Sequence, residues 1–246
     1  MNIAIILSGG VGSRMGASIP KQYIEVDGKP VIWYCLKTFF ENPLIDSVVI
    51  GRAEEWAEYV EEQVRSVMTD KPVYYSLPGE TRQYSIFNAL MEAEKHGAEE
   101  DDIVIVHDAA RPLVSDAIIN SCLLGCHEAD GTLPVIPVKD TLYQSVDGEN
   151  ITSLLKRDEL FAGQAPEAFV FGKYLHLHKE MPHKELLSIN GSTEIAYKGG
   201  LHVKLIKGDE MNFKITTPED LSNFESIINQ RKNESIRSSS SERPAI

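Results

Sequence analysis

Short runs of apolar residues alternate with amphipathic segments along most of the chain. The apolar runs predict buried strands, because a strand that is covered on both faces in a parallel sheet is apolar at nearly every position. These runs lie at residues 2–7, Ser47–Gly51, Val73–Ser76, Ile103–His107, Gly131–Val138, Ala168–Phe171 and His202–Lys207. Helical periodicity predicts helices at Pro30–Phe40, Ala53–Met68, Gln83–His96 and Asp116–His127. This alternation favours an α/β fold whose mostly parallel sheet is covered by helices on both faces.

Residues 140–158 interrupt the alternation. The segments Tyr143–Ser145 and Ile151–Leu154 flank the turn sequence Asp147-Gly148-Glu149-Asn150. Two short strands around such a turn predict a β-hairpin. Because this hairpin lies outside the regular pattern, we expect it to protrude as an arm. The residues alone are also compatible with an ordinary surface hairpin.

The length of 246 residues suits one α/β domain, which we place at residues 1–230. Residues 231–246 are rich in serine and charge and offer little apolar surface, so we expect a disordered tail there. No apolar run approaches the roughly 20 residues that span a bilayer, and the first residues lack the basic segment of a secretion signal. These features indicate a cytoplasmic protein with no membrane partner.

Acidic residues exceed basic ones by 37 to 24, which gives a net charge of −13. This excess disfavours a role in binding nucleic acid, so any anionic substrate has to be met by locally placed cations. The three cysteines, Cys35, Cys122 and Cys126, are too few and too irregularly spaced for a disulfide framework or a zinc site. We expect them to be buried thiols.

The first predicted strand runs directly into a glycine-rich loop with two cations. The sequence is Leu7-Ser8-Gly9-Gly10-Val11-Gly12-Ser13-Arg14-Met15-Gly16, followed by Pro20-Lys21-Gln22. Glycines let backbone N–H groups approach phosphate oxygens closely, and Arg14 and Lys21 can neutralise the charge that amides alone cannot. The spacing matches neither a Walker A loop nor a dinucleotide fingerprint. The loop therefore predicts a site for a triphosphate.

A carboxylate follows a second strand at the same predicted edge of the sheet. Asp108 comes directly after the apolar run Ile103–Val106 and His107. The carboxyl ends of parallel strands meet at one edge, so we expect Asp108 to face the glycine loop. A carboxylate there suits a Mg²⁺ ion that bridges phosphates. We assign His107 a structural role below the site.

A second glycine-containing segment opens a predicted helix. It contains Gly79, Glu80, Arg82 and Ser85. Backbone groups at the start of a helix are suited to contacting a base edge and a ribose. Spacing alone does not select the base.

The glycine loop resembles the nucleotide-binding signature of the sugar-phosphate nucleotidyltransferases, and Pro20-Lys21-Gln22 narrows the resemblance to the alditol-phosphate cytidylyltransferases. Members of this family act on 2-C-methylerythritol 4-phosphate or on ribitol 5-phosphate. Further similar motifs follow in the same order, from Ile3 to about Leu221: Gly79-Glu80-Thr81-Arg82-Gln83-Tyr84-Ser85, Val106-His107-Asp108-Ala109-Ala110-Arg111-Pro112, Pro137-Val138-Lys139-Asp140-Thr141 and Asn212-Phe213-Lys214-Ile215-Thr216-Thr217-Pro218.

The resemblance implies a Rossmann-like fold and the conversion of CTP and an alditol phosphate to a CDP-alditol and pyrophosphate, with Mg²⁺ as cofactor. Catalytic roles are implied for Arg14, Lys21 and Lys214. Contacts to the nucleotide, with cytosine as the base, are implied for Leu7, Ser8, Gly9, Gly10, Gly12, Gly79, Glu80, Arg82 and Ser85. Contacts to the polyol phosphate or its metal ion are implied for Asp108, Arg111, Thr141 and Arg157, the last two from the arm of a neighbouring subunit. A homodimer formed through the hairpin arm is therefore expected.

Two departures from the family pattern concern the polyol. The usual Gln-Thr-Pro-Gln reads Gln164-Ala165-Pro166-Glu167 here, which removes a hydroxyl expected near the polyol phosphate. The usual Thr-Asp or Ser-Asp segment reads Asn190-Gly191-Ser192-Thr193-Glu194, so a nearby carboxylate is displaced. We slightly favour D-ribitol 5-phosphate, which would link the product to cell-wall or capsule polymers such as teichoic acid, over methylerythritol phosphate, which would link it to isoprenoid precursors.

Two other functional classes compete with this interpretation. An NAD-dependent oxidoreductase is disfavoured by the glycine spacing and by the lack of a Tyr-x-x-x-Lys pair. A catalytically silent nucleotide-binding subunit predicts the loss of phosphate-handling residues. Arg14, Lys21, Asp108 and Lys214 are all present, which favours an enzyme.

Overall fold

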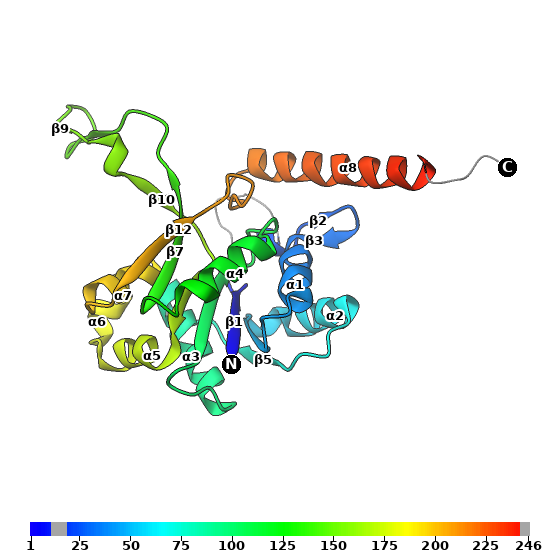
Figure 1. Ribbon diagram of the computed structural model, residues 1–246, viewed down its shortest axis with the longest axis horizontal. Helices are drawn as coiled ribbons and strands as arrows, with labels where there is room; N and C mark the ends of the chain where they lie inside the picture. The colour runs from blue at the N-terminus through cyan, green and yellow to red at the C-terminus, as the bar shows by residue number, and fades with distance from the viewer. Residues whose placement is uncertain (11–18, 242–246) are drawn as a thin grey trace.

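The computed structural model describes residues 1–10 and 19–241, and within them eight strands form one central sheet (Figure 1). The strand order is β10-β7-β11-β6-β1-β4-β5, and β12 pairs with β7. The strands are β1 Asn2–Leu7, β4 Ser47–Gly51, β5 Val73–Ser76, β6 Ile103–Asp108, β7 Gly131–Pro137, β10 Phe161–Gly163, β11 Glu167–Val170 and β12 Val203–Lys207. Strands β6, β1, β4 and β5 are parallel, whereas β10 and β11 run antiparallel to their neighbours. The predicted α/β class with a mostly parallel sheet is confirmed.

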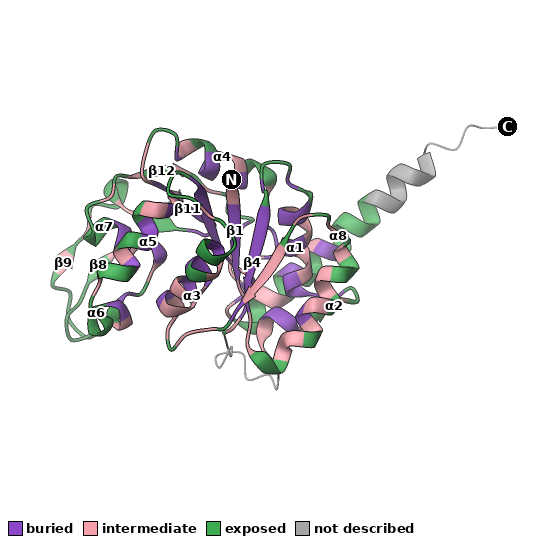
Figure 2. Ribbon diagram, turned by 90° about the horizontal axis from the view of Figure 1, so that it is seen from below, coloured by how far each residue is buried: buried purple, intermediate pink, exposed green. Residues whose placement is uncertain are grey.

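Helices cover both faces of the sheet. Alternate residues of β1 point to opposite faces, so that Ala4 and Ile6 join one hydrophobic cluster and Ile3 and Ile5 join another. The first cluster packs against α1 Val31–Glu41, α2 Ala57–Val67 and α4 Asp116–Gly125. The second packs against α3 Arg82–Lys95, α5 Phe171–Glu180, α6 His183–Ser188 and α7 Ser192–Lys198. Strands β1 and β4 are correspondingly buried over most of their length (Figure 2).

The predicted strands and helices agree with the structure to within one or two residues at most ends. Residues Glu54–Trp56 form the short 3-10 helix η3 before α2, so the helix predicted for Ala53–Met68 begins irregularly. Strand β10 and the small hairpin of β2 Glu25–Val26 and β3 Lys29–Pro30 were not predicted, because two or three residues are too few to show a period. Cys35, Cys122 and Cys126 are buried free thiols, as expected.

The predicted hairpin is present in the arm. Strand β8 Tyr143–Gln144 pairs antiparallel with β9 Ser153–Leu154, and the pair stands away from the sheet (Figure 1). The Asp147 carboxylate organises the turn by accepting hydrogen bonds from the backbone N–H groups of Glu149 and Asn150 at 2.9 and 2.8 Å. Apolar side chains on the arm are largely exposed, with Val146 84% exposed.

The last helix, α8 Pro218–Ser241, continues past Gln230, where the sequence predicted a disordered tail. The start of the helix is capped by the Asp220 carboxylate, which accepts hydrogen bonds from the backbone N–H groups of Thr216 and Thr217 at 2.8 Å. Beyond Gln230, Lys232 forms an ion pair with Asp27 at 2.6 Å. A polar helix needs no buried face when its residues have fair helix propensity, which a composition-based argument overlooks. None of the helices in residues 1–10 and 19–241 is both long enough and apolar enough to span a membrane.

The buried His178 predicts acid sensitivity of the fold. Burial lowers its pKa from 6.5 to about 4, and its Nδ1–H donates to the Tyr174 carbonyl at 2.8 Å. Since the unfolded chain takes up the proton near pH 6.5 and the folded chain only near pH 4, stability is lost as the pH falls below 6.5. We expect His178 to account for roughly 2 kcal/mol of the free energy of unfolding lost between pH 7 and 5. Urea unfolding of His178→Gln should therefore show a shallower pH slope than the wild type, and equal slopes would contradict the assignment.

Candidate active site

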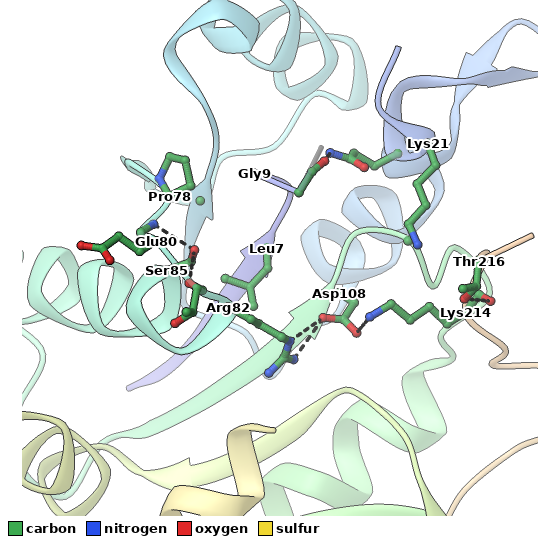
Figure 3. A pocket seen from close by; sticks show the side chains of 16 residues that line it. Leu7, Gly9, Lys21, Pro78, Glu80, Arg82, Ser85, Asp108, Lys214 and Thr216 are labelled. Atoms are coloured by element: carbon green, nitrogen blue, oxygen red, sulfur yellow. Dashed lines mark hydrogen bonds and ion pairs between the residues drawn. The ribbon is translucent and has the colours of Figure 1, made fainter. Parts of the chain in front are cut away.

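A pocket of about 470 Å³ opens at the carboxyl ends of β1, β4 and β6. The last residue of β1, Leu7, lies beside both Gly51 at the end of β4 and Asp108 at the end of β6. Ligand sites of open α/β sheets form at this edge. The pocket is lined by Leu7, Gly9, Gly10, Lys21, Gln22, Gly51, Pro78, Gly79, Glu80, Thr81, Arg82, Ser85, Asp108, Ala110, Lys214 and Thr216 (Figure 3).

The loop after β1 forms one wall of this pocket. Gly9 and Gly10 line it, whereas Ser8 lies beneath them, with its hydroxyl donating to the Gly51 carbonyl at 2.9 Å. The Gln22 side-chain amide donates to the carbonyls of Ser8 and Gly10 at 2.6 and 2.8 Å, so it ties the loop to η2 Lys21–Tyr23. This contact explains physically why glutamine follows Lys21.

Lys21 is the predicted loop cation that lies within the described residues. Lys21 lines the pocket and extends its side chain into it (Figure 3). Gly12 and Arg14 lie outside the described residues.

The second glycine segment faces the first across the pocket. Thr81 caps α3 by accepting from the Tyr84 N–H at 3.3 Å, and the Ser85 hydroxyl accepts from the Gly79 N–H at 3.0 Å. A Cβ on Gly79 would lie 2.3 Å from the Cβ of Tyr84, so this close turn requires glycine. The turn brings residues 78–81 to the pocket wall, and their contacts to a base and ribose stay a prediction.

Asp108 is held between two cations from distant parts of the chain (Figure 3). Its Oδ1 accepts from Nε and Nη2 of Arg82 at 3.1 and 3.0 Å, and its Oδ2 accepts from Nζ of Lys214 at 2.8 Å. Burial opposes its ionisation, but the charges of Arg82 and Lys214 outweigh burial and hold the pKa of Asp108 well below its usual range. Asp108 is thus an anion at any physiological pH.

Arg82 joins the site to a buried polar cluster behind it. Its Nη1 donates to the Ser192 hydroxyl, and its Nη2 lies 3.8 Å from Oε1 of Glu167. The sequence grouped Arg82 with the base-contacting residues. In the structure Arg82 is part of the pocket wall and its guanidinium pairs with Asp108.

His107 and Arg111 lie beside the pocket rather than in its wall. Burial lowers the pKa of His107 to about 4, and its Nε2 lies 3.0 Å from the Arg111 carbonyl. This arrangement suits the structural role that the sequence suggested. Arg111 Nη1 donates to the Asn212 carbonyl at 2.7 Å, which links the segment after β6 to the segment that carries Lys214.

The arm residues do not reach the pocket of their own chain. Neither Thr141 nor Arg157 lines it. Arg157 Nη1 donates to the Lys139 carbonyl at 3.3 Å, and its Nε lies 3.8 Å from Asp158, so among the described residues its polar contacts are local to the arm.

The two segments that depart from the family pattern, Gln164–Glu167 and Asn190–Glu194, are both described by the structure. Ala165 is buried and forms a cis peptide with Pro166. Glu194, the carboxylate of the altered acidic segment, forms an ion pair with Lys198 at 2.9 Å and accepts from the Asn190 N–H at 2.8 Å. Glu167, which ends the altered Gln164–Glu167 segment, is a second carboxylate near Arg82, at 3.8 Å.

Several pocket residues were absent from the predicted set. They are Gln22, Gly51, Pro78, Thr81, Ala110 and Thr216. Each lies in or next to a recognised motif or at a predicted strand end, so its position along the chain could have placed it in the pocket. Glu167 and Ser192, which contact Arg82 from outside the pocket wall, lie in the two altered motif segments, but nothing in those segments indicated a contact with Arg82.

Comparison with known proteins identifies the family. The profile described as 2-C-methyl-D-erythritol 4-phosphate cytidylyltransferase matches residues 2–230. A protein of that name from Clostridium beijerinckii is 38% identical over 218 residues, which cover 89% of this chain and 94% of the relative. A ribitol-5-phosphate cytidylyltransferase from Streptococcus agalactiae serotype Ia is 31% identical over 237 residues, which cover 96% and 99%. The solved 2-C-methyl-D-erythritol 4-phosphate cytidylyltransferase of Francisella tularensis has a TM-score of 0.74 at 26% identity, over 91% of this chain and 99% of that one.

The named relatives differ in the alcohol phosphate but agree in cytidylyl transfer. The glycine loop, Lys21, Asp108 and Lys214 converge on one pocket, which agrees with the family's chemistry. The chain belongs to the 2-C-methyl-D-erythritol 4-phosphate cytidylyltransferase family and is a cytidylyltransferase.

Proposed function

We propose that this protein transfers a cytidylyl group from CTP to D-ribitol 5-phosphate, releasing pyrophosphate. The observation that carries the proposal is the convergence of the glycine loop and Lys21 with Asp108 and Lys214 in one pocket. Support for ribitol comes from the ribitol-5-phosphate relative, which the chain matches over 96% of its length, and from the altered residues at Ala165 and 190–194.

In this reaction a phosphate oxygen of the polyol attacks the α-phosphorus of CTP, and the bond to the pyrophosphate leaving group breaks. The attacking phosphate is already ionised near neutral pH, so the enzyme needs no side-chain nucleophile. Positioning and charge neutralisation then supply the rate. Lys21, with Arg14, is suited to stabilise the leaving pyrophosphate, and Lys214 is suited to the α-phosphate or the incoming phosphate.

The donor set fits a magnesium ion that is held mainly by substrate. Within residues 1–10 and 19–241, no three His, Cys, Asp or Glu side chains are grouped as a metal cage. Mg²⁺ in phosphate-transfer sites is typically bound by one or two carboxylates together with phosphate oxygens, and Asp108 offers such a carboxylate in the pocket. The ion would screen the negative charges of the two substrates as they meet.

The proposal is tested by pyrophosphate release with CTP and Mg²⁺, with ribitol 5-phosphate, 2-C-methylerythritol 4-phosphate and glycerol 3-phosphate offered separately. We expect release with ribitol 5-phosphate. Release only with 2-C-methylerythritol 4-phosphate would favour the second candidate function, which the 38% identical relative motivates. CTP binding without release on any of these would support the silent-subunit alternative. Omission of Mg²⁺ should abolish release.

The arm is suited to complete the polyol site of a neighbouring subunit in a homodimer. Its exposed apolar side chains and the distance of Thr141 and Arg157 from their own pocket support this arrangement. A guanidinium binds phosphate in a bidentate manner, so Arg157→Ala should raise the KM for the polyol phosphate about tenfold and leave the KM for CTP unchanged. Steady-state kinetics with one substrate varied at a time checks this expectation. An unchanged KM for the polyol phosphate would contradict the arm's role.

A further inference from the structure

A buried carboxylate lies directly behind the arginine that holds Asp108. Glu167 is the first residue of β11, is 8% exposed and is not part of the pocket wall. Its Oε1 lies 3.8 Å from Nη2 of Arg82, and its Oε2 accepts from the Thr193 hydroxyl at 2.6 Å. Thus Arg82 lies between two carboxylates, Asp108 on the pocket side and Glu167 on the buried side.

The helix α7 holds this cluster in place. Its first residue, Ser192, accepts a hydrogen bond from Nη1 of Arg82 through its hydroxyl, and its carbonyl accepts from the Tyr174 hydroxyl at 3.0 Å. Thr193 fixes one oxygen of Glu167 and so directs the other toward the arginine. Two of the groups that contact Arg82, the Ser192 hydroxyl and the Glu167 carboxylate, therefore lie outside the pocket wall.

Arg82 needs such a restraint because the site is expected to bind two polyanions. A guanidinium on a flexible side chain pairs readily with phosphate, and Arg82 is itself part of the pocket wall. If a substrate phosphate drew Arg82 away, Asp108 Oδ1 would lose both of its arginine hydrogen bonds. A second carboxylate on the buried side opposes this movement electrostatically.

We infer that Glu167, supported by Thr193 and Ser192, is a positioning residue that keeps Arg82 on Asp108 while the phosphates of the substrates occupy the pocket. Glu167 acts only through Arg82 and touches no substrate. The expected effect on kcat rests on the proposed transfer reaction. The restraint of the Arg82 guanidinium by Glu167 does not.

The substitution Glu167→Gln tests the inference while preserving size and the acceptor for Thr193. Because the freed Arg82 can then pair with substrate phosphate in the ground state, kcat should fall roughly tenfold while the KM for the alditol phosphate stays constant or falls. Calorimetry should still give one CTP site per chain, which excludes loss of folded enzyme as the cause. A raised KM with an unchanged kcat would overturn the inference.

A double-mutant cycle separates action through Arg82 from any other role. In the Arg82→Gln background, Glu167→Gln should change kcat by less than about twofold, since no guanidinium remains to be restrained. A further tenfold loss in that background would overturn the inference. Glu94→Gln is the matched control, because the Glu94 carboxylate also forms an ion pair, with Lys179 at 2.7 Å, but lies outside the pocket wall, and it should leave kcat unchanged.

Exchange of the Arg82 Nε–H proton with water can be measured without turnover, so it tests the role of Glu167 independently of the proposed reaction. In ¹⁵N-arginine-labelled protein with CTP bound, the Nε–H signal that is lost in Arg82→Lys should exchange slowly with water. It should exchange at least about tenfold faster in Glu167→Gln if Glu167 restrains the guanidinium. Equal exchange in the two proteins would overturn the inference even if cytidylyl transfer is found. Faster exchange would support it even if no tested alditol phosphate reacts.

Discussion

Lys21→Ala is expected to lower kcat by about 100- to 1,000-fold while leaving the protein folded. Lys21 lines the pocket beside the glycine loop, so its ammonium group is placed to stabilise the charge that develops on the leaving pyrophosphate. That charge is greater in the transition state than in bound CTP, and the loss should therefore appear mainly in kcat rather than in the KM for CTP. Pyrophosphate release under saturating substrates measures the effect, and circular dichroism monitors folding.

A nearby lysine provides the control for this substitution. Lys29 lies outside the pocket wall, with its ammonium group 5.1 Å from the centre of the Trp33 ring. Lys29→Ala should keep nearly full turnover. Near-normal activity of Lys21→Ala would refute the role assigned to Lys21, whatever the control shows.

Asp108→Asn is expected to reduce turnover by at least about 100-fold. The amide preserves size but removes the charge that pairs with Arg82 and Lys214, so neither cation keeps its present partner. It also removes a pocket carboxylate that the proposed Mg²⁺ ion would use as a ligand. Pyrophosphate release should fall at every Mg²⁺ concentration, and additional Mg²⁺ should restore little of it.

The outcome that contradicts this assignment is turnover within about threefold of the wild type. A thermal melt of Asp108→Asn should accompany the assay, since a partly buried pair of cations without its anion is unfavourable. If the melt is unchanged while turnover is lost, the carboxylate acts on the reaction itself. Turnover that is lost only because the protein unfolds would instead assign Asp108 to the fold.

The strands of the central sheet could be predicted because burial on both faces leaves a mark within each short segment of the sequence. A strand buried on both faces must be apolar along its length, and the runs at Ser47–Gly51 and Val73–Ser76 matched β4 and β5 at both ends. The short strand β10 shows no period, and its place is set by pairing with β7. The part of α8 beyond Gln230 was not predicted as helix. Its residues form no apolar face, and a disordered tail was expected there for that reason.

The candidate site was predictable where a strand end or a loop carries the chemistry. Leu7 and Asp108 end neighbouring strands, so their meeting follows from the topology of a parallel sheet. The partners of Arg82 could not be predicted in this way, because Glu167 and Ser192 reach it from distant parts of the chain through tertiary packing. The proposed contribution of the arm involves a second chain, which the pattern of apolar and polar residues in one sequence does not describe.

Gly9 and Pro78 limit how this enzyme could be engineered for a different base. A methyl group on Gly9 would lie 2.6 Å from the Cβ of Pro78, so the two loops that form opposite walls of the pocket are in close steric contact. Enlarging one loop forces the other to retreat, and separate libraries at either position would mostly yield misshapen pockets. A purine-accepting variant should therefore emerge from coupled randomisation of residues 9 and 78–80, with the loop lengths varied together.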